Sequence, residues 1–205
     1  MGGLGILLVV GLYLAAAIWI VAKSPGWWRL VALLAVVLIP TADALWGRYV
    51  TLPRLCKDAG LKVYAKGSKE EGLMLSTADD YLLKKYGFPF VEGVDGARKV
   101  YRRSLRDGMA VTELDVQPQA RYVVSLEKLQ PTSNVTGAAI VLRDKTTGSA
   151  VGELIDFGFN GGWAERFLSS FAGSGSGPIV RSGCGVDDFS YDRLLVAVFE
   201  PRSAK

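Results

Sequence analysis

The chain begins with two long apolar runs that are almost free of charged side chains. Residues 1–22 carry no Asp, Glu, Lys or Arg, and a second run, charged only near its end, extends from Leu30 to Tyr49. About 20 apolar residues are enough to cross the hydrocarbon core of a bilayer as an α-helix. The pattern therefore predicts a hairpin of two membrane-spanning helices, at residues 3–22 and 30–49.

A cleaved signal peptide and a buried helix pair of a soluble protein are the alternatives to this hairpin. A signal peptide needs a basic amino-terminal region and a small-x-small cleavage site. The first run contains no Lys or Arg, and Val21-Ala22-Lys23-Ser24 is a poor cleavage site. We therefore favour an uncleaved hairpin.

The connection between the two runs has the composition of a turn at a membrane surface. Residues 23–29 read KSPGWWR, which combines a Pro-Gly turn signal with two Trp and two basic residues suited to the headgroup layer. Farther along, Pro40 is expected to kink the second helix, and a neighbouring helix can cover the carbonyl that Pro40 leaves unpaired.

Charged residues become frequent after position 50, so residues 51–205 form a domain distinct from the two-helix membrane anchor in residues 1–50. This length is enough for one compact domain with its own core. We expect an α+β fold, in which a mostly antiparallel β domain with one or two short helices follows the transmembrane helical hairpin. Strands are expected at residues 61–65, 72–75, 88–92, 99–105, 109–116, 121–126 and 194–199.

Two local patterns in this domain are the clearest. Residues 79–86 open with acidic and close with basic side chains before Gly87, as a capped helix does. Residues 138–143 and 150–157 flank the turn sequence DKTTG and predict a β-hairpin. The spacing of three aromatic residues also predicts a short helix at 163–171.

The amino-acid composition excludes several kinds of catalytic and metal-binding site. The 205-residue chain contains no His and two Cys. This excludes Ser-His-Asp and Cys-His nucleophile pairs, His-ligated metal or haem, and four-thiolate zinc or iron–sulfur sites. The net charge of +4 is too small to indicate nucleic acid as a partner. We expect no cofactor and no metal, and we assign no catalytic residue.

Two groups of charged residues are candidates for contacts at the membrane. Asp43 and Arg48 lie at the end of the second helix, where a pair would fix the depth at which the helix leaves the bilayer or would contact a partner helix. The densest basic run is expected to bind lipid headgroups or a partner, unless acidic residues elsewhere neutralise it. It consists of Arg98, Lys99, Arg102, Arg103 and Arg106.

One stretch of the chain is similar to a known group of proteins. Residues 39–48 read IPTADALWGR and residues 55–64 read LCKDAGLKVY. This stretch resembles proteobacterial inner-membrane proteins of unknown activity, in which a membrane helix ends in Pro-x-x-Asp-x-x-x-Gly-Arg before a Leu-Cys pair and a Lys-Val-Tyr-like strand. Their hairpin turn is also similar to DKTTG at 144–148. The resemblance implies a bacterial envelope protein and assigns no role to any residue.

The basic residues give conflicting indications of which side of the membrane the domain faces. The turn between the helices carries two, and the start of the chain none, which favours a cytoplasmic turn with the domain outside. Five basic residues shortly after the second helix favour the opposite arrangement. We favour a periplasmic domain, where Cys56 and Cys184 can form a disulfide, whereas in the cytoplasm both would remain reduced.

These features predict a membrane-anchored interaction domain in the bacterial inner membrane. The first hypothesis is a non-enzymatic accessory subunit of an envelope complex, with the lipid bilayer and other membrane proteins as partners. The alternatives are an immunity or exclusion protein that binds an incoming effector, and an envelope hydrolase that uses only carboxylates. A periplasmic ligand sensor is a further class, although no signalling domain is attached.

Overall fold

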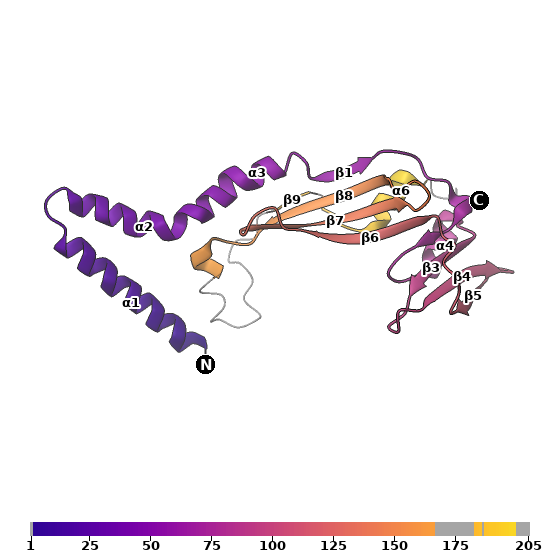
Figure 1. Ribbon diagram of the computed structural model, residues 1–205, viewed down its shortest axis with the longest axis horizontal. Helices are drawn as coiled ribbons and strands as arrows, with labels where there is room; N and C mark the ends of the chain where they lie inside the picture. The colour runs from indigo at the N-terminus through magenta and orange to yellow at the C-terminus, as the bar shows by residue number, and fades with distance from the viewer. Residues whose placement is uncertain (1, 167–182, 186, 200–205) are drawn as a thin grey trace. The chain divides into compact units, whose positions relative to one another are not determined.

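The computed structural model describes residues 2–166, 183–185 and 187–199, and it combines helices with a mixed β-sheet (Figure 1). The protein is therefore α+β, as predicted. The chain divides into two compact units. The helical unit comprises residues 1–58, 130–137 and 157–184, and the sheet unit comprises residues 59–129, 138–156 and 185–205.

Both amino-terminal apolar runs are helical. α1 spans Gly2–Lys23 and α2 spans Trp28–Trp46. A π-helical turn, η1, at Gly47–Thr51 and the short helix α3 at Leu52–Leu55 continue the chain beyond α2. Pro53 lies at the start of α3 and has no N–H to donate, which favours the change in hydrogen-bond spacing before it.

Within the described residues, no single helix combines the length and the apolar character needed to cross a bilayer. By these two criteria alone, the segments Trp28–Val36 and Thr41–Leu55 qualify together as a bent pair, with 61° between them. The break contains Pro40, where a kink was expected. Pro40 also leaves the carbonyl of Val36 without its helical donor, and the Tyr13 hydroxyl of α1 donates to that carbonyl, as the sequence predicted.

The sheet has the strand order β1-β8-β7-β6-β2-β3-β4-β5, and β9 also pairs with β8. The pairs β1–β8, β3–β4, β4–β5 and β8–β9 are antiparallel, whereas β2 runs parallel to both β3 and β6, so the sheet is mixed. The strands are β1 Gly60–Val63, β2 Leu73–Met74, β3 Phe90–Val94, β4 Val100–Arg106, β5 Met109–Leu114, β6 Tyr122–Leu129, β7 Val135–Asp144, β8 Ala150–Phe159 and β9 Gly183–Cys184. The predicted hairpin around residues 144–148 is confirmed as β7 and β8.

The capped helix predicted at residues 79–86 is α4, Asp80–Tyr86. Its N-cap Asp79 accepts a hydrogen bond from the Tyr81 amide, and Gly87 ends it in the left-handed conformation with φ of 74°. Of the helix predicted at 163–171, residues 163–166 are helical, and the rest lies outside the described residues.

The strand predicted at residues 194–199 is wrong, because this segment belongs to helix α6, Tyr191–Val198. The Ser190 side chain caps the helix by accepting from the Arg193 amide. A short apolar run fits a strand or a helix equally well, and here the helical spacing buries Leu194, Leu195 and Val198 together.

The hydrophobic core of the sheet unit lies among β2, β3, β6, β7, β8, α4 and α6. Phe199, directly after α6, has no exposed surface, and its ring lies edge-on to Phe88 and Tyr122 at centroid distances of 5.0 and 5.2 Å. α6 is held to α4 by Asp192, which accepts from Lys85 Nζ at 2.6 Å and from the Tyr86 hydroxyl at 2.9 Å. Burial, and then this bond to Asp192, raises the pKa of Tyr86 above its usual value.

Candidate functional site

The end of α2 is where segments far apart in the sequence meet within the helical unit. Asp43 Oδ2 accepts a hydrogen bond of 2.7 Å from the Trp163 amide and lies 3.9 Å from Arg166 Nη2. The Asp43 carbonyl accepts from Asn134 Nδ2 at 2.8 Å, and Trp163 Nε1 donates to the Ile39 carbonyl at 3.3 Å. We call this set of contacts the Asp43 junction.

Gly47 allows the close packing on which the junction depends. A Cβ at this position would lie 2.3 Å from Asn134 Nδ2 and 2.9 Å from the Phe159 ring. Asn134 is buried, and its Oδ1 accepts a hydrogen bond from the Thr132 hydroxyl. Both the oxygen and the nitrogen of its side-chain amide are therefore hydrogen-bonded. Any side chain at Gly47 would displace this buried amide.

The structure places Asp43 Oδ2 3.9 Å from Arg166 Nη2, and among the described residues it shows no ion pair between Asp43 and Arg48. On an α-helix, residues five apart point about 140° away from each other, which separates the two side chains. The Arg48 guanidinium instead lies 5.7 Å from the centroid of the Tyr49 ring. Whether either residue marks a membrane boundary stays a prediction.

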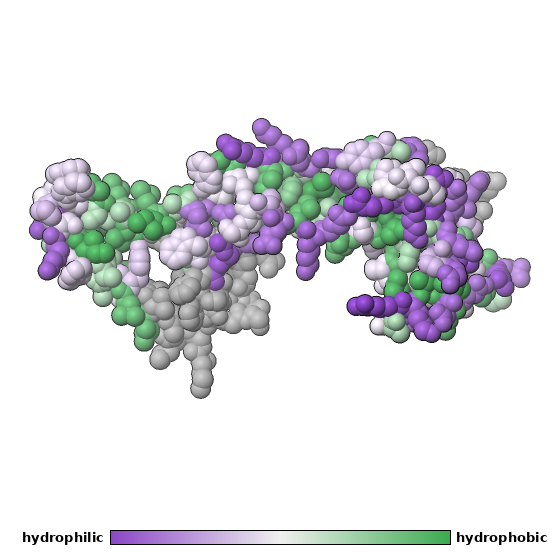
Figure 2. All heavy atoms as spheres, viewed as in Figure 1, coloured by the Kyte–Doolittle hydropathy of each residue, from purple (hydrophilic) through white to green (hydrophobic). Residues whose placement is uncertain are grey.

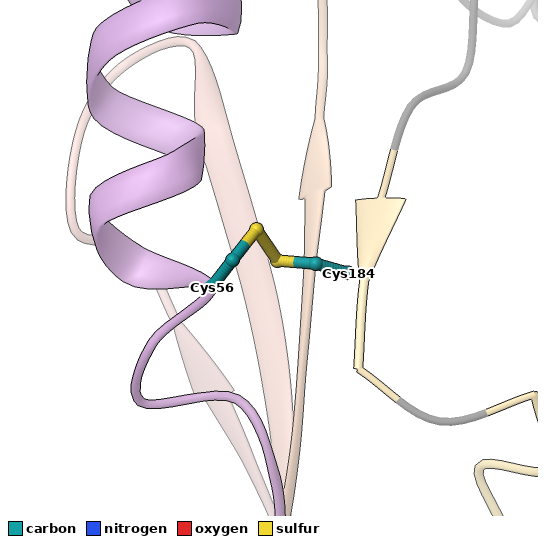
Figure 3. The surroundings of a disulfide bond; sticks show 2 residues. All are labelled: Cys56 and Cys184. Atoms are coloured by element: carbon teal, nitrogen blue, oxygen red, sulfur yellow. A yellow bond between two sulfur atoms is a disulfide. The ribbon is translucent and has the colours of Figure 1, made fainter.

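A disulfide joins Cys56, just after α3, to Cys184 in β9 (Figure 3). Both cysteines belong to the helical unit, and 128 positions separate them along the chain. Cys184 pairs with Phe157 of β8 in the sheet register. The bridge therefore fixes the end of the helical segment to this part of β8, and it confirms the disulfide predicted from the sequence.

The basic run is mostly neutralised by acidic neighbours. Because β4 is a strand, its cations alternate between the two faces of the sheet, and Arg98 and Lys99 precede it. The ion pairs are Lys99–Asp115 at 2.8 Å, Arg102–Glu92 at 2.7 Å, Arg103–Asp80 at 2.9 Å and Arg106–Glu113 at 2.9 Å. This geometry favours the solvated-charge interpretation over a dedicated lipid site.

The most buried of these pairs joins Glu92 to Arg102, and sequence reasoning missed it. Glu92 has no exposed surface, and besides Arg102 it accepts hydrogen bonds from the amides of Gln119 and Ala120. Arg102 lies directly opposite Glu92 in the antiparallel ladder of β3 and β4. Had the sequence been interpreted as a β-hairpin with its turn at residues 95–99, the register would have placed Glu92 opposite Arg102.

A second buried carboxylate, Asp144, begins the turn between β7 and β8. It accepts from Arg121 Nε and Nη2, and from the amide and hydroxyl of Thr146. Arg121 also pairs with Glu71. The Arg121 guanidinium, followed by the Thr146 hydroxyl, holds the pKa of Asp144 well below its usual range.

These contacts hold segments of the chain in position. In the part of the chain that the structure describes, no group of three or more His, Cys, Asp or Glu is arranged to hold a metal ion. The two buried carboxylates, Glu92 and Asp144, are each bound by an arginine and by further donors. Neither is placed as a general acid or base in a cleft.

Comparisons of this chain with protein-family models, with curated proteins and with solved structures gave no match.

Proposed function

We propose that this chain is a membrane-anchored interaction domain, a non-enzymatic accessory subunit of a bacterial envelope complex. One observation carries the proposal: large apolar side chains of α1 and α2 are exposed. Leu12, Ile18 and Ile39 are 64%, 68% and 65% exposed. Figure 2 shows hydrophobic residues along both helices. An apolar surface of this kind is covered by lipid or by another protein.

The turn between α1 and α2 supports a place at the surface of a bilayer. Trp27 and Trp28 lie with ring centroids 4.5 Å apart and are both exposed, and Lys23 Nζ lies 5.4 Å from the Trp19 ring centroid. Arg29 Nε donates to the Ser24 carbonyl at 2.9 Å. Aromatic and basic side chains together are typical of the headgroup layer.

The disulfide supports a periplasmic position for the segment that follows α3. Structural disulfides form in oxidising compartments and are rare in the cytoplasm. If the segment after α3 is periplasmic, the hairpin turn with Lys23 and Arg29 faces the cytoplasm, in agreement with the positive-inside rule. The disulfide thus favours one of the two arrangements that the basic residues left open.

A binding role fits the polar groups better than a hydrolytic one does. A carboxylate-dependent hydrolase needs two carboxyl groups that converge on a cleft. Glu92 and Asp144 are instead saturated with donors and tie loops to strands. An immunity or exclusion protein would have the same anchor and differ only in its partner, so it remains the nearest alternative.

Alkaline carbonate washing of membranes tests the anchor. We expect the protein in the pellet, and we expect the double variant Leu12→Lys, Ile18→Lys to move to the supernatant, because charges in a spanning helix are costly. The matched control is Leu114→Lys, Leu126→Lys, which changes two exposed apolar residues of the sheet unit. Release of the unaltered protein, or equal release of both double variants, would refute the anchor.

Native electrophoresis of mild-detergent membrane extracts tests the role as a subunit. We expect the unaltered protein to migrate well above the size of its own micelle, in a band that does not depend on its expression level. A protein that migrates alone would contradict the accessory-subunit proposal while leaving the anchor intact.

A further inference from the structure

β6 has an open backbone edge over most of its length. It pairs with β7 on one side and with β2 on the other, but β2 reaches only Tyr122 and Val123. Within the described residues, no strand pairs with Val124–Leu129 on the β2 side of β6 (Figure 1). The backbone N–H and C=O groups along such an edge form a template to which an extended chain can add.

An apolar groove of about 500 Å³ lies beside this edge. Residues of β6, β2, β3, β7 and α6 line this groove, and all of the lining residues belong to the sheet unit. Leu126 is 67% exposed in this groove although it is a large apolar residue on a strand. The groove is lined chiefly by Met74, Val94, Val124, Leu126, Ile140 and Tyr191.

Two lysines that form no ion pair with a described residue lie close to residues of the groove. Lys128 is exposed and follows Leu126 by two positions, so both side chains lie on the same face of β6. Lys145 Nζ lies 3.5 Å from the sulfur of Met74. Neither ammonium group forms an ion pair with a described residue, whereas Glu127 is neutralised by Arg143 at 2.8 Å. The groove is therefore apolar, and the positive charge of Lys128 lies on the same face of β6 as Leu126.

A second copy of this chain leaves Lys128 without an acidic partner at the edge. Two antiparallel copies of β6 related by a two-fold axis pair about one central residue. Centring on Leu126 places Lys128 opposite Val124, and centring on Glu127 places two carboxylates opposite each other. A different sequence, with an acidic residue opposite Lys128, fits better.

We propose that the open edge of β6 binds an extended segment of a partner protein by β-strand addition. Apolar side chains at alternating positions of that segment fill the groove, and an acidic side chain on the same face of the segment pairs with Lys128. This inference rests on the proposed function as an interaction domain and names the chemistry of the partner.

The test uses the full-length protein in detergent micelles and a synthetic peptide of sequence ETVTVTE with blocked ends, in which the valines and the glutamates lie on the same face of the extended peptide. We expect the peptide to bind and to slow hydrogen exchange at the amides of residues 124–129. Leu126→Glu should weaken binding about tenfold, and Lys128→Glu about fivefold. The matched control, Leu114→Glu, changes another exposed leucine on the open edge strand β5 and should leave binding unchanged.

Three outcomes would overturn the inference. The first is no binding, or binding of the same strength to a peptide in which lysine replaces each glutamate. The second is an equal loss of affinity in the Leu114→Glu control. The third is self-association through the edge, seen as disulfide-linked dimers of a Leu126→Cys variant. Because peptide binding is measured in micelles, its failure does not affect the carbonate result, and failure of the anchor does not affect peptide binding.

Discussion

The two units cover their apolar side chains in different ways. In the sheet unit, large apolar residues such as Leu83 and Phe199 have no exposed surface, and two buried carboxylates are held by arginines. In the helical unit, α1 and α2 leave residues such as Leu12 and Ile18 mostly exposed, and a disulfide ties the end of the helical segment to β9. The sheet unit therefore has a hydrophobic core of its own, whereas α1 and α2 leave large apolar side chains uncovered.

The largest effect is expected from opening the core of the sheet unit. Phe199→Ala removes a fully buried ring that contacts Phe88 and Tyr122, and it should lower the free energy of unfolding by about 3–5 kcal/mol. The matched change in α1, Trp19→Ala, removes a ring that is 62% exposed and should cost less than about 1 kcal/mol in micelles.

Denaturant unfolding monitored by circular dichroism measures both variants. Equal losses of stability in Phe199→Ala and Trp19→Ala would mean that α1 is buried against protein in micelles as thoroughly as Phe199 is. The two units would then not differ in how far they bury their apolar side chains.

The next largest expected effect is the difference in stability lost when two arginines of β4 are replaced. Arg102→Met leaves the fully buried carboxylate of Glu92 without its cation and should destabilise the protein by about 3 kcal/mol or more. Arg106→Met breaks the exposed pair with Glu113 and should cost about 0–1 kcal/mol. Thermal unfolding of the two variants gives the comparison.

If Arg102 and Arg106 proved equivalent, Glu92 would not be buried as the structure shows. A lower affinity for vesicles of anionic lipid in both variants would restore the basic run as a lipid site. We expect the affinity for vesicles to be unchanged by Arg102→Met, because that guanidinium is already occupied by Glu92 and by the Gln117 carbonyl.

Elements with strong local signals were predictable from the sequence, and the contacts between distant segments were not. The helix from Asp80 to Tyr86 has its caps in the adjacent residues, and the hairpin around Asp144 has its turn in five consecutive positions. The helix from Tyr191 to Val198 was mistaken for a strand, because its apolar run is short and its position depends on Asp192 meeting Lys85 and Tyr86.

In the candidate site, too, contacts between distant segments other than the disulfide could not be predicted from the sequence. Cys56 and Cys184, the two cysteines of the chain, were expected to pair if the domain is periplasmic, and the structure joins them. The partners of Asp43 could not be predicted, because Asn134 and Trp163 are about 90 and 120 positions away in the chain. Local spacing suggested Arg48 instead, although helical geometry points that side chain in another direction.

The disulfide provides a test confined to the helical unit. Replacing both Cys56 and Cys184 by Ser should lower the stability of this unit by about 2–4 kcal/mol, because the bridge closes a loop of 128 positions in the unfolded chain. Hydrogen exchange should become faster near η1 and β9 and should stay unchanged in α4 and β3. Free thiols at both positions in intact cells, found by gel-shift labelling, would remove the bridge and with it the support for a periplasmic position.

The smallest expected effect is a loss of stability at acid pH, and it should appear in the sheet unit alone. The pKa of Asp144 is lowered in the fold by Arg121 and Thr146, so its contribution to stability is fully present above the pKa of an unfolded aspartate, about 3.9, and is lost as the pH falls toward the folded value. The difference in unfolding midpoint between the natural chain and Asp144→Asn should therefore be constant from pH 7 to pH 5 and shrink below about pH 4. The disulfide carries no titrating thiol, so exchange near η1 and β9 should not follow this curve. A difference in midpoint that stays constant down to pH 3 would show that Asp144 is not held by a charged pair, and that the turn between β7 and β8 is stabilised by its backbone alone.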